Sequence, residues 1–196
     1  MKSHLNFFYG IILCFFSVSF EAFASEVEVP IRNQLPILQR LLATETNLKK
    51  NKREIVAGVI YQSNVRTSNQ TKNELFTFAR NERVTIGEAA LRLVPINIDN
   101  AANNIYDILN GGEKYHFLII TQLRSVNYRE ISRYSTHKSV LTFATCVDVM
   151  RNHKFSIAIG YKGNSPQIIV NLDTLQAEGF SFPSQVLRHV RRISDD

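Results

Sequence analysis

The apolar positions of the chain fall into separated runs, a pattern typical of an α/β domain. Three continuous runs, at 55–61, 116–120 and 139–143, have the composition of strands that are buried on both faces. A weaker apolar stretch lies at 91–94. Because strands buried on both faces belong to sheets covered by helices on two sides, the pattern predicts a mostly parallel sheet.

Amphipathic helical patterns separate these runs. The clearest extends from Ala102 to Leu109 with i, i+3, i+4 and i+7 spacing, and Asp99 is its predicted N-cap. Shorter apolar faces of the same kind are Leu75, Phe76 and Ala79, then Tyr128, Ile131 and Tyr134, and, after a predicted helix start at Pro36, Leu38, Leu41 and Leu42. This alternation of strands and helices predicts right-handed crossovers between parallel strands.

The last third of the chain changes period. Apolar and small residues alternate over 155–161 and again over 168–172, and the turn residues between them predict an antiparallel hairpin. Four apolar residues then fit one face of a final helix: Val186, Leu187, Val190 and Ile193. The predicted fold is a mixed, mostly parallel sheet flanked by helices, with a C-terminal antiparallel hairpin and a closing amphipathic helix, in one domain over 25–196.

The first residues of the chain predict export. Lys2 precedes an apolar run over 5–20, and Ala22-Phe23-Ala24 provides an A-x-A cleavage site, with a small residue at its first and third positions. Because the run is short for a membrane span, a cleavable signal peptide over 1–24 is favoured, with an uncleaved N-terminal anchor as the alternative. The mature domain is therefore expected in the periplasm.

After cleavage, Cys146 is the one that remains of the 2 cysteines, so no intramolecular disulfide can form. Two interpretations of Cys146 stay open: a buried small hydrophobe, or an exposed thiol available for a redox or intermolecular event. A third would pair it with His153 as nucleophile and base, although the sequence supplies no orienting third group.

Basic residues give the chain a net charge of +6 and gather at 49–53 and at three C-terminal arginines. Such clusters attract an anionic membrane surface or an acidic partner, whereas the alternative is a solvated face. The predicted partner-binding residues are Arg188, Arg191, Arg192 and Cys146. Nucleic acid is a poor candidate, because the chain lacks the interleaved aromatic and basic residues that bind single strands.

Polar and mostly uncharged side chains follow three of the predicted strands. Ligands of open α/β sheets bind beyond the carboxyl ends of the strands, where the strand order reverses, so this edge is the predicted ligand pocket. Its candidate residues are Gln62, Ser63, Asn64, Thr121, Gln122, Arg124 and Thr145. The alternative is that they are ordinary turn and cap residues.

Motifs for catalysis are missing from the sequence. It contains no glycine-rich phosphate-binding motif and no G-x-S-x-G elbow, and its histidines lack the spacing of metal ligands. The sequence therefore predicts a protein that is not an enzyme and holds neither a cofactor nor a metal.

The stretch 167–193 carries the most specific pattern. A strand ends at Asn171-Leu172, Gly179 closes a short polar helix, and Pro183 precedes the Leu-Arg-containing closing segment. These residues resemble the C-terminal motif of the YfiR-like family of exported bacterial proteins. The resemblance covers 55–193, with its specific part after Phe155.

The resemblance implies a periplasmic regulator without catalytic activity. Such a protein would bind the sensing domain of an inner-membrane signalling protein, typically a diguanylate cyclase, and restrain cyclic di-GMP output. Proximity to the membrane surface and a homodimer stay open. Family members often carry a Trp-Pro pair, and a cysteine where this chain has Tyr115-His116, so the likeness implies no disulfide-based control here. From the residues, the alternative is a small-ligand-binding module that uses the polar carboxyl edge.

Overall fold

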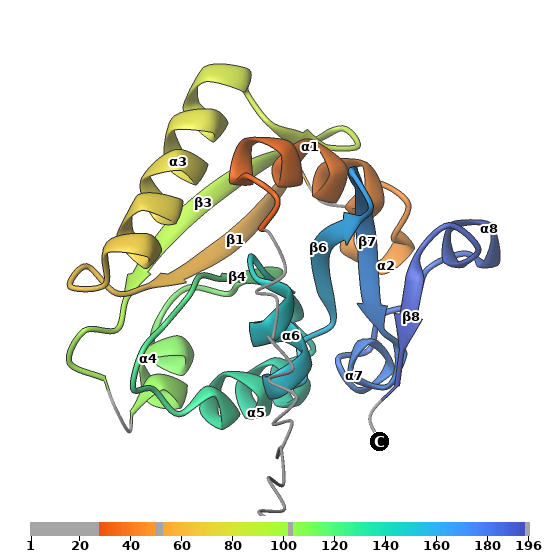
Figure 1. The fold of residues 1–196 in the computed structure, drawn as a ribbon. Coiled ribbons are helices and arrows are strands. Elements are labelled where there is room, and N and C mark those ends of the chain that lie inside the picture. The colour runs from red at the N-terminus through yellow and green to blue at the C-terminus, as the bar shows by residue number, and fades with distance from the viewer. Residues whose placement is uncertain (1–27, 50–52, 102–103, 195–196) are drawn as a thin grey trace, which may run out of the picture.

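The computed structural model describes residues 28–49, 53–101 and 104–194. The strands are β1 (Glu54–Tyr61), β2 (Thr85–Ile86), β3 (Ala89–Asn97), β4 (Phe117–Ile120), β5 (Leu141–Ala144), β6 (Ile157–Lys162), β7 (Ser165–Asn171) and β8 (Arg191–Ile193). The helices are α1 (Ile31–Leu42), α2 (Thr46–Lys49), α3 (Arg66–Glu82), α4 (Ile105–Gly111), α5 (Tyr128–Lys138), α6 (Val147–His153), α7 (Leu172–Ala177) and α8 (Ser184–Leu187). These strands form one sheet in the order β2-β3-β1-β4-β5-β6-β7-β8 (Figure 1).

The N-terminal prediction concerns residues outside this description, because the signal peptide was placed over 1–24. Among the helices of the described ranges, none has both the length and the apolar composition needed to cross a membrane.

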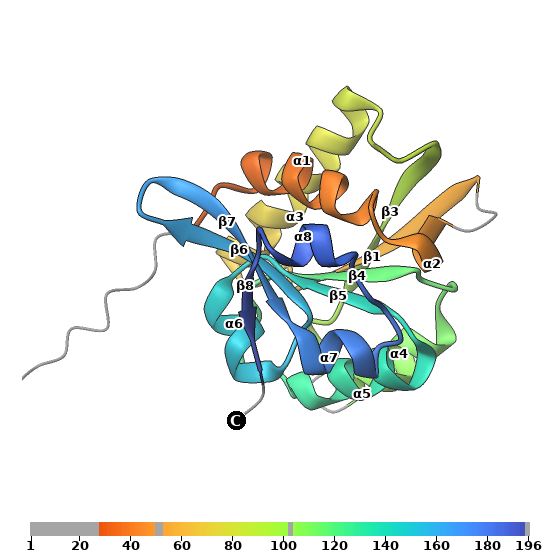
Figure 2. The ribbon, with the colours of Figure 1, turned by 90° about the vertical axis from the view of Figure 1, so that its right-hand side faces the viewer.

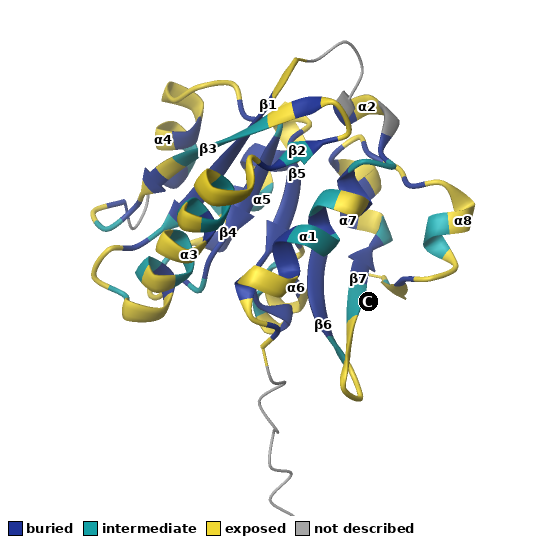
Figure 3. Ribbon diagram, turned by 90° about the horizontal axis from the view of Figure 1, so that it is seen from above, coloured by how far each residue is buried: buried dark blue, intermediate teal, exposed yellow. Residues whose placement is uncertain are grey.

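Helices cover both faces of the sheet (Figures 1 and 2). On one face, α1, α2 and α3 contribute buried side chains to a cluster that also contains Phe117 and Phe143. On the other face, α4, α5 and α6 pack against Leu118 and Ile120. Figure 3 shows the central strands buried along most of their length. This two-sided burial confirms the prediction drawn from the continuous apolar runs.

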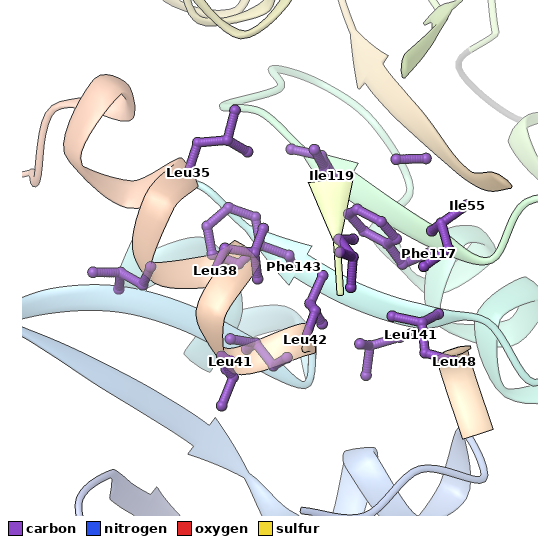
Figure 4. Close-up of a cluster of buried hydrophobic side chains, with 14 of the residues drawn as sticks. Leu35, Leu38, Leu41, Leu42, Leu48, Ile55, Phe117, Ile119, Leu141 and Phe143 are labelled. Atoms are coloured by element: carbon purple, nitrogen blue, oxygen red, sulfur yellow. The ribbon is translucent and has the colours of Figure 1, made fainter. Parts of the chain in front are cut away.

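Helix α1 supplies much of the first cluster. Leu35, Leu38 and Leu42 are each at most 2 % exposed and face the sheet from one side of the helix. Figure 4 shows them beside Phe117 and Phe143, which point up from β4 and β5. Full burial of a leucine or phenylalanine side chain contributes about 1.5–3 kcal/mol. The contact therefore holds the N-terminal helix firmly on the sheet.

Strand β1 lies between β3 and β4 and runs parallel to both. The chain passes from β1 to β3 on one side and then crosses back to β4 on the other, so the strand order reverses at the carboxyl ends of β1 and β4. At the centre of β1, a Cβ on Gly58 would lie 2.6 Å from Ile96 Cδ1 and 2.9 Å from Leu118 Cδ2. Glycine therefore lets the side chains of Ile96 and Leu118 pack directly over the backbone, and a larger residue would displace their ends.

Two predicted helix starts are wrong. Helix α1 begins at Ile31, and Pro36 lies inside it, because Pro30 already supplies the carbonyl that accepts from the first turn and the buried leucines outweigh the N–H that Pro36 lacks. Helix α4 has Asn104 rather than Asp99 at its N-cap. The Asp99 carboxylate instead accepts hydrogen bonds from the loop after β1.

The C-terminal hairpin is confirmed. Strands β6 and β7 pair antiparallel from Ile157 opposite Val170 to Lys162 opposite Ser165. Gly163 has φ +59°, the conformation that the first residue of a two-residue type II′ loop requires. The hairpin lies toward one edge of the sheet, as the period-two pattern predicted.

The closing helix is much shorter than predicted. Helix α8 ends at Leu187, and Arg191–Ile193 form β8, which pairs parallel with β7. Val190 packs in the cluster of one face and Ile193 against that of the other, as alternation in a strand requires. A spacing of three residues fits one face of a helix equally well, so the pattern was ambiguous. The unpaired edge of β7 offers hydrogen bonds that a two-turn helix could not match in stability.

A buried carboxyl joins the end of α7 to the sheet. Glu178 is 0 % exposed and accepts hydrogen bonds from the Thr142 backbone N–H (3.0 Å) and the Thr142 hydroxyl (2.8 Å). The Ser156 hydroxyl also donates to it. Burial raises the pKa of Glu178 to about 7, and the hydrogen bonds from Ser156 and Thr142 oppose the rise. The carboxyl is therefore neutral in the folded protein over much of the acidic range.

We predict that the fold loses stability as the pH rises through neutrality. Between the ordinary glutamate pKa of 4.5 and the folded value of about 7, the folded state holds a proton that the unfolded chain has released. The protonated Glu178 contributes its full stabilisation below pH 4.5 and loses it as the pH rises above about 7. The free energy of unfolding should therefore fall by about 3 kcal/mol across this range. Urea unfolding between pH 4.5 and pH 8 measures it.

Glu178→Gln should flatten this pH dependence, because an amide has no proton to release, whatever its effect on the absolute stability. Glu82→Gln, which changes an exposed carboxyl at the end of α3, should leave the slope as it is in the parent protein. An unchanged slope in Glu178→Gln would contradict the assignment.

Candidate functional site

A cavity of about 420 Å³ lies at the carboxyl ends of β1, β3 and β4. This is where the strand order reverses, and the loops that leave the two sides of the sheet diverge there. The lining residues come from the loops after these three strands: Gln62, Asn64, Val65, Ile98, Asp99, Arg124, Ser125 and Val126. The cavity therefore occupies the position at which open α/β sheets bind ligands.

Gln62 ties the loop after β1 to the loop after β4. Its Oε1 accepts from the Arg124 backbone N–H (2.7 Å), and its Nε2 donates to the Arg124 carbonyl (3.1 Å). The Gln62 side chain is 6 % exposed, and both bonds are partly buried. This pair of bonds fixes the backbone of Arg124 at the cavity.

A chain of hydroxyls supports the floor of the site. The Gln62 N–H donates to Ser68 Oγ (2.9 Å), and Thr121 Oγ1 donates to the Ile60 carbonyl (2.9 Å). Since the Thr121 proton is used in that bond, the Ser68 hydroxyl donates to Thr121 Oγ1 (2.6 Å). Ser68 and Thr121 are both 0 % exposed. The chain joins the first turn of α3 to the ends of β1 and β4.

Asp99 organises the loop after β1 from the end of β3. Its carboxylate accepts from the Ser63 N–H (2.6 Å), the Asn64 N–H (3.4 Å) and the Asn97 side-chain amide (3.1 Å). The Ser63 hydroxyl donates to it as well. The hydrogen bond from the Ser63 hydroxyl has the largest effect on the pKa of Asp99, and together these bonds hold that pKa below its ordinary value. The negative charge of Asp99 therefore stabilises the loop after β1 by accepting its hydrogen bonds.

Two groups that attract anions are available at this cavity, the Arg124 side chain and the start of α3. The Arg124 guanidinium is exposed and forms no hydrogen bond or ion pair with the residues that the structure describes. Helix α3 begins at the cavity wall after Val65, and no side chain caps its first turn. The free N–H groups of that turn carry the positive end of the helix dipole. Together these groups favour an anionic or carboxylate-bearing molecule.

Tyr128 connects the same loop to α5. Its hydroxyl donates to the Leu123 carbonyl (3.0 Å) and accepts from the Leu123 N–H (3.1 Å). Burial raises the pKa of Tyr128, so the hydroxyl stays protonated. The residue before Arg124 is thereby held by the first residue of α5.

The structure brings together part of the predicted pocket. Gln62, Asn64 and Arg124 line the cavity, while Ser63 and Thr121 support it through their hydrogen bonds. Gln122 and Thr145 are elsewhere. Gln122 donates to the Glu28 side chain, and the Thr145 hydroxyl donates to the Ile120 carbonyl (3.3 Å).

Asp99 was missed as a site residue because its local pattern is that of a helix N-cap. A signal was present in the sequence, since Asn97 and Asp99 follow the third strand that meets this edge. Val65, Ile98 and Val126 are apolar, and nothing in a single sequence distinguishes them from core residues.

Cys146 is a free cysteine, 8 % exposed, which agrees with its interpretation as a buried small hydrophobe. Burial raises the pKa of the thiol, and this disfavours the reactive thiolate. His153 is stacked on the Tyr128 ring at a centroid distance of 3.9 Å, and burial lowers its pKa. Neither residue lines the cavity described above.

The predicted partner-binding arginines are all exposed. Arg188 follows α8, and Arg191 and Arg192 lie on β8, the last strand of the described sheet. They are separate in space from Cys146, which follows the carboxyl end of β5, because β6 and β7 lie between β5 and β8 in the sheet. The structure therefore divides the predicted partner-binding set into a basic edge and a buried thiol.

Comparisons with known proteins place the fold. No family model and no curated protein match the chain. The solved structures that share the fold include a conserved domain protein from Vibrio cholerae (9% identity, TM-score 0.61), an ABC domain in complex with L-Trp from Streptococcus pneumonia (11%, 0.58), and a ligand-free, open substrate-binding protein with adhesive properties from Clostridium difficile (14%, 0.56).

The alignments cover 85%, 84% and 86% of this chain but 60%, 62% and 61% of the other chains. The chain thus spans about three fifths of the length of these structures. At such low identity the likeness concerns the α/β fold alone, and two of the neighbours are described by the ligands or substrates that they bind.

We predict that Thr121→Val destabilises the protein by about 2 kcal/mol, because it leaves the buried Ser68 hydroxyl proton without an acceptor and removes one of the two hydrogen bonds that the Ile60 carbonyl accepts from Thr121. Thr145→Val is the matched control, since its hydroxyl makes one longer bond of 3.3 Å, and it should cost under about 1 kcal/mol. Urea unfolding compares the two. If both variants lose the same free energy of unfolding, the hydrogen bonds of Thr121 stabilise the fold no more than that of Thr145, which would contradict the prediction.

Proposed function

We propose that this chain is a periplasmic, non-catalytic module that binds a small ligand at the carboxyl ends of β1, β3 and β4. The observation that carries the proposal is the cavity of about 420 Å³ at the point where the strand order reverses. Ligand cavities of proteins commonly measure about 300–1,000 Å³. The predicted signal peptide supports the location.

Pre-organisation of the site supports a binding role. Gln62 and Asp99 hold the two loops with hydrogen bonds made within the protein, so little ordering is required when a ligand arrives. Arg124 keeps its guanidinium unpaired among the described residues, although its backbone is fixed. A rigid backbone with an available charged side chain is a suitable arrangement for orienting a ligand.

The ligand that fits best carries a carboxylate or a similar anionic group. Arg124 would bind this group with paired N–H donors, and the first turn of α3 would add its free N–H groups. Val65, Ile98 and Val126 provide an apolar surface for the remainder of the molecule. The L-Trp bound by one structural neighbour has these two parts, a charged head and an apolar body.

We predict that Arg124→Ala weakens ligand binding by about tenfold or more, because a hydrogen bond to a charged group contributes about 1.5–3 kcal/mol. A thermal-shift screen of free amino acids and small carboxylates identifies the probe, since a ligand of the folded state raises the unfolding midpoint. Calorimetry then compares the variants.

Arg129→Ala is the matched control, because Arg129 is exposed on the first turn of α5 and does not line the cavity. It should bind as the parent does. If no compound raises the midpoint, or if both variants lose affinity equally, the cavity is not the proposed site.

A second candidate function is the regulation of a membrane signalling protein, and the basic edge of the sheet favours it. No described strand pairs with the outer side of β8, and Arg191 and Arg192 are both exposed there. An open edge with two positive charges suits an acidic, extended segment of a periplasmic sensing domain, which could add a strand. A diguanylate cyclase that carries such a domain is the partner implied by the YfiR-like pattern.

We predict that the double variant Arg191→Glu with Arg192→Glu abolishes capture of such a sensing domain, because like charges would face one another. The pair Arg129→Glu with Lys162→Glu makes the same change in net charge elsewhere and should preserve capture. A pull-down from detergent-solubilised inner membranes measures both. Capture that persists in the β8 variant would argue against this surface.

A further inference from the structure

A second cavity lies at the opposite end of the sheet, beside the amino ends of β4 and β5. Its volume is about 590 Å³, which is enough for a small organic molecule. The walls come from the loop between α4 and β4, the end of α5, and the residues just after Glu178. The proposed ligand site above shares none of these segments.

Tyr134 places at this cavity a hydroxyl that has no hydrogen-bond partner among the described residues. The residue is 4 % exposed, and its ring packs edge-on against Tyr106 at a centroid distance of 5.8 Å. No described residue forms a hydrogen bond with its hydroxyl. Gln34 Oε1 is the one side-chain polar atom of the described residues that is both fully enclosed and without a partner. The Tyr134 hydroxyl is therefore not fully enclosed, and it is open to the cavity that the residue lines. Buried phenols normally have a partner, and here a ligand could supply it.

The charge left over at this cavity is positive. Lys114 and Lys138 are exposed on its rim, and neither forms a salt bridge with a described acid. The neighbouring carboxylate, Glu113, is occupied by Arg92 through two hydrogen bonds of 3.2 and 2.6 Å. Lys138 also stabilises the negative end of α5, in whose last turn it lies. Lys114 is in a loop and has no such role.

Apolar side chains form one part of the wall. Val140 is 3 % exposed and Phe180 is 8 % exposed. Gly112 and Tyr115 also line the cavity, and a Cβ on Gly112 would lie 2.5 Å from the Tyr115 hydroxyl, so a larger residue there would shift that ring. The cavity thus combines a donor-rich side with an apolar side.

We propose that this cavity is a second binding site, for a small organic oxyanion whose carboxylate or phosphate group is bound by Tyr134 and Lys114. The apolar part of the molecule packs against Val140 and Phe180. A donor hydroxyl and an ammonium group are both suited to anionic oxygens, and no unpaired described acid lines the cavity to repel them. The site is independent of the one at the carboxyl ends of the strands.

Phenyl phosphate and benzoate are the probes, with benzylamine as the probe of opposite charge. We expect saturable amide shifts at Gly112, Ser139 and Gly179 in NMR titrations of the full mature chain with at least one of the two anions. Lys114→Ala should weaken that binding by at least about threefold, and Tyr134→Phe by about fivefold, as expected for charge-assisted hydrogen bonds. The preferred anion identifies the phosphate or the carboxylate as the recognised group.

Two controls separate binding from a structural role. Lys162→Ala, an exposed lysine on β6, should leave the affinity unchanged. Tyr134→Phe should keep the urea midpoint of the parent, because its hydroxyl has no protein partner to lose. A fall in that midpoint, equal shifts with benzylamine, an unchanged affinity in Lys114→Ala, or shifts confined to Asn64 and Ser125 would each overturn the proposal. The last result would assign the probe to the other cavity.

Discussion

The burial of β1 between two parallel neighbours is the constraint on which the rest of this structure depends. Its residues from Ile55 to Ile60 are buried on both faces, and even its glycine is covered by side chains of β3 and β4. Helices must therefore lie on both sides of the sheet. Because the chain passes from β1 to β3 on one side and returns to β4 on the other, the loops after β1 and β4 separate where these strands end, and the cavity at the carboxyl ends follows from the order of the strands.

The two ends of the sheet differ in how their polar groups are used. At the carboxyl end, the side chains of Gln62, Ser68 and Asp99 form hydrogen bonds within the protein. The guanidinium of Arg124 is the exception, because it forms none with the described residues. At the amino end, the hydroxyl of Tyr134 is left open while the carboxyl of Glu178 is enclosed and fully bonded. At each end of the sheet, the polar groups that stabilise the fold are therefore different from the groups that are available to bind a ligand.

The sequence was most informative where burial is two-sided. Short continuous apolar runs predict strands buried on both faces, because an amphipathic helix has polar residues between its apolar ones. The prediction failed where local patterns have two solutions. Val190 and Ile193 fit a helix face and an edge strand alike, and Asp99 fits a helix cap and a loop ligand alike; long-range contacts decide both. For the same reason Gln62 and Arg124 could be placed at one edge, but their mutual hydrogen bonds could not be foreseen.

Helix α5 extends from one end of the sheet to the other. Tyr128 in its first turn grips the loop before Arg124, and Lys138 in its last turn stands at the second cavity. A helix of 11 residues is about 16 Å long, so this one element positions residues near both cavities. If a ligand at one end were to tilt the helix, thermodynamic reciprocity would require each ligand to change the affinity of the other by the same factor.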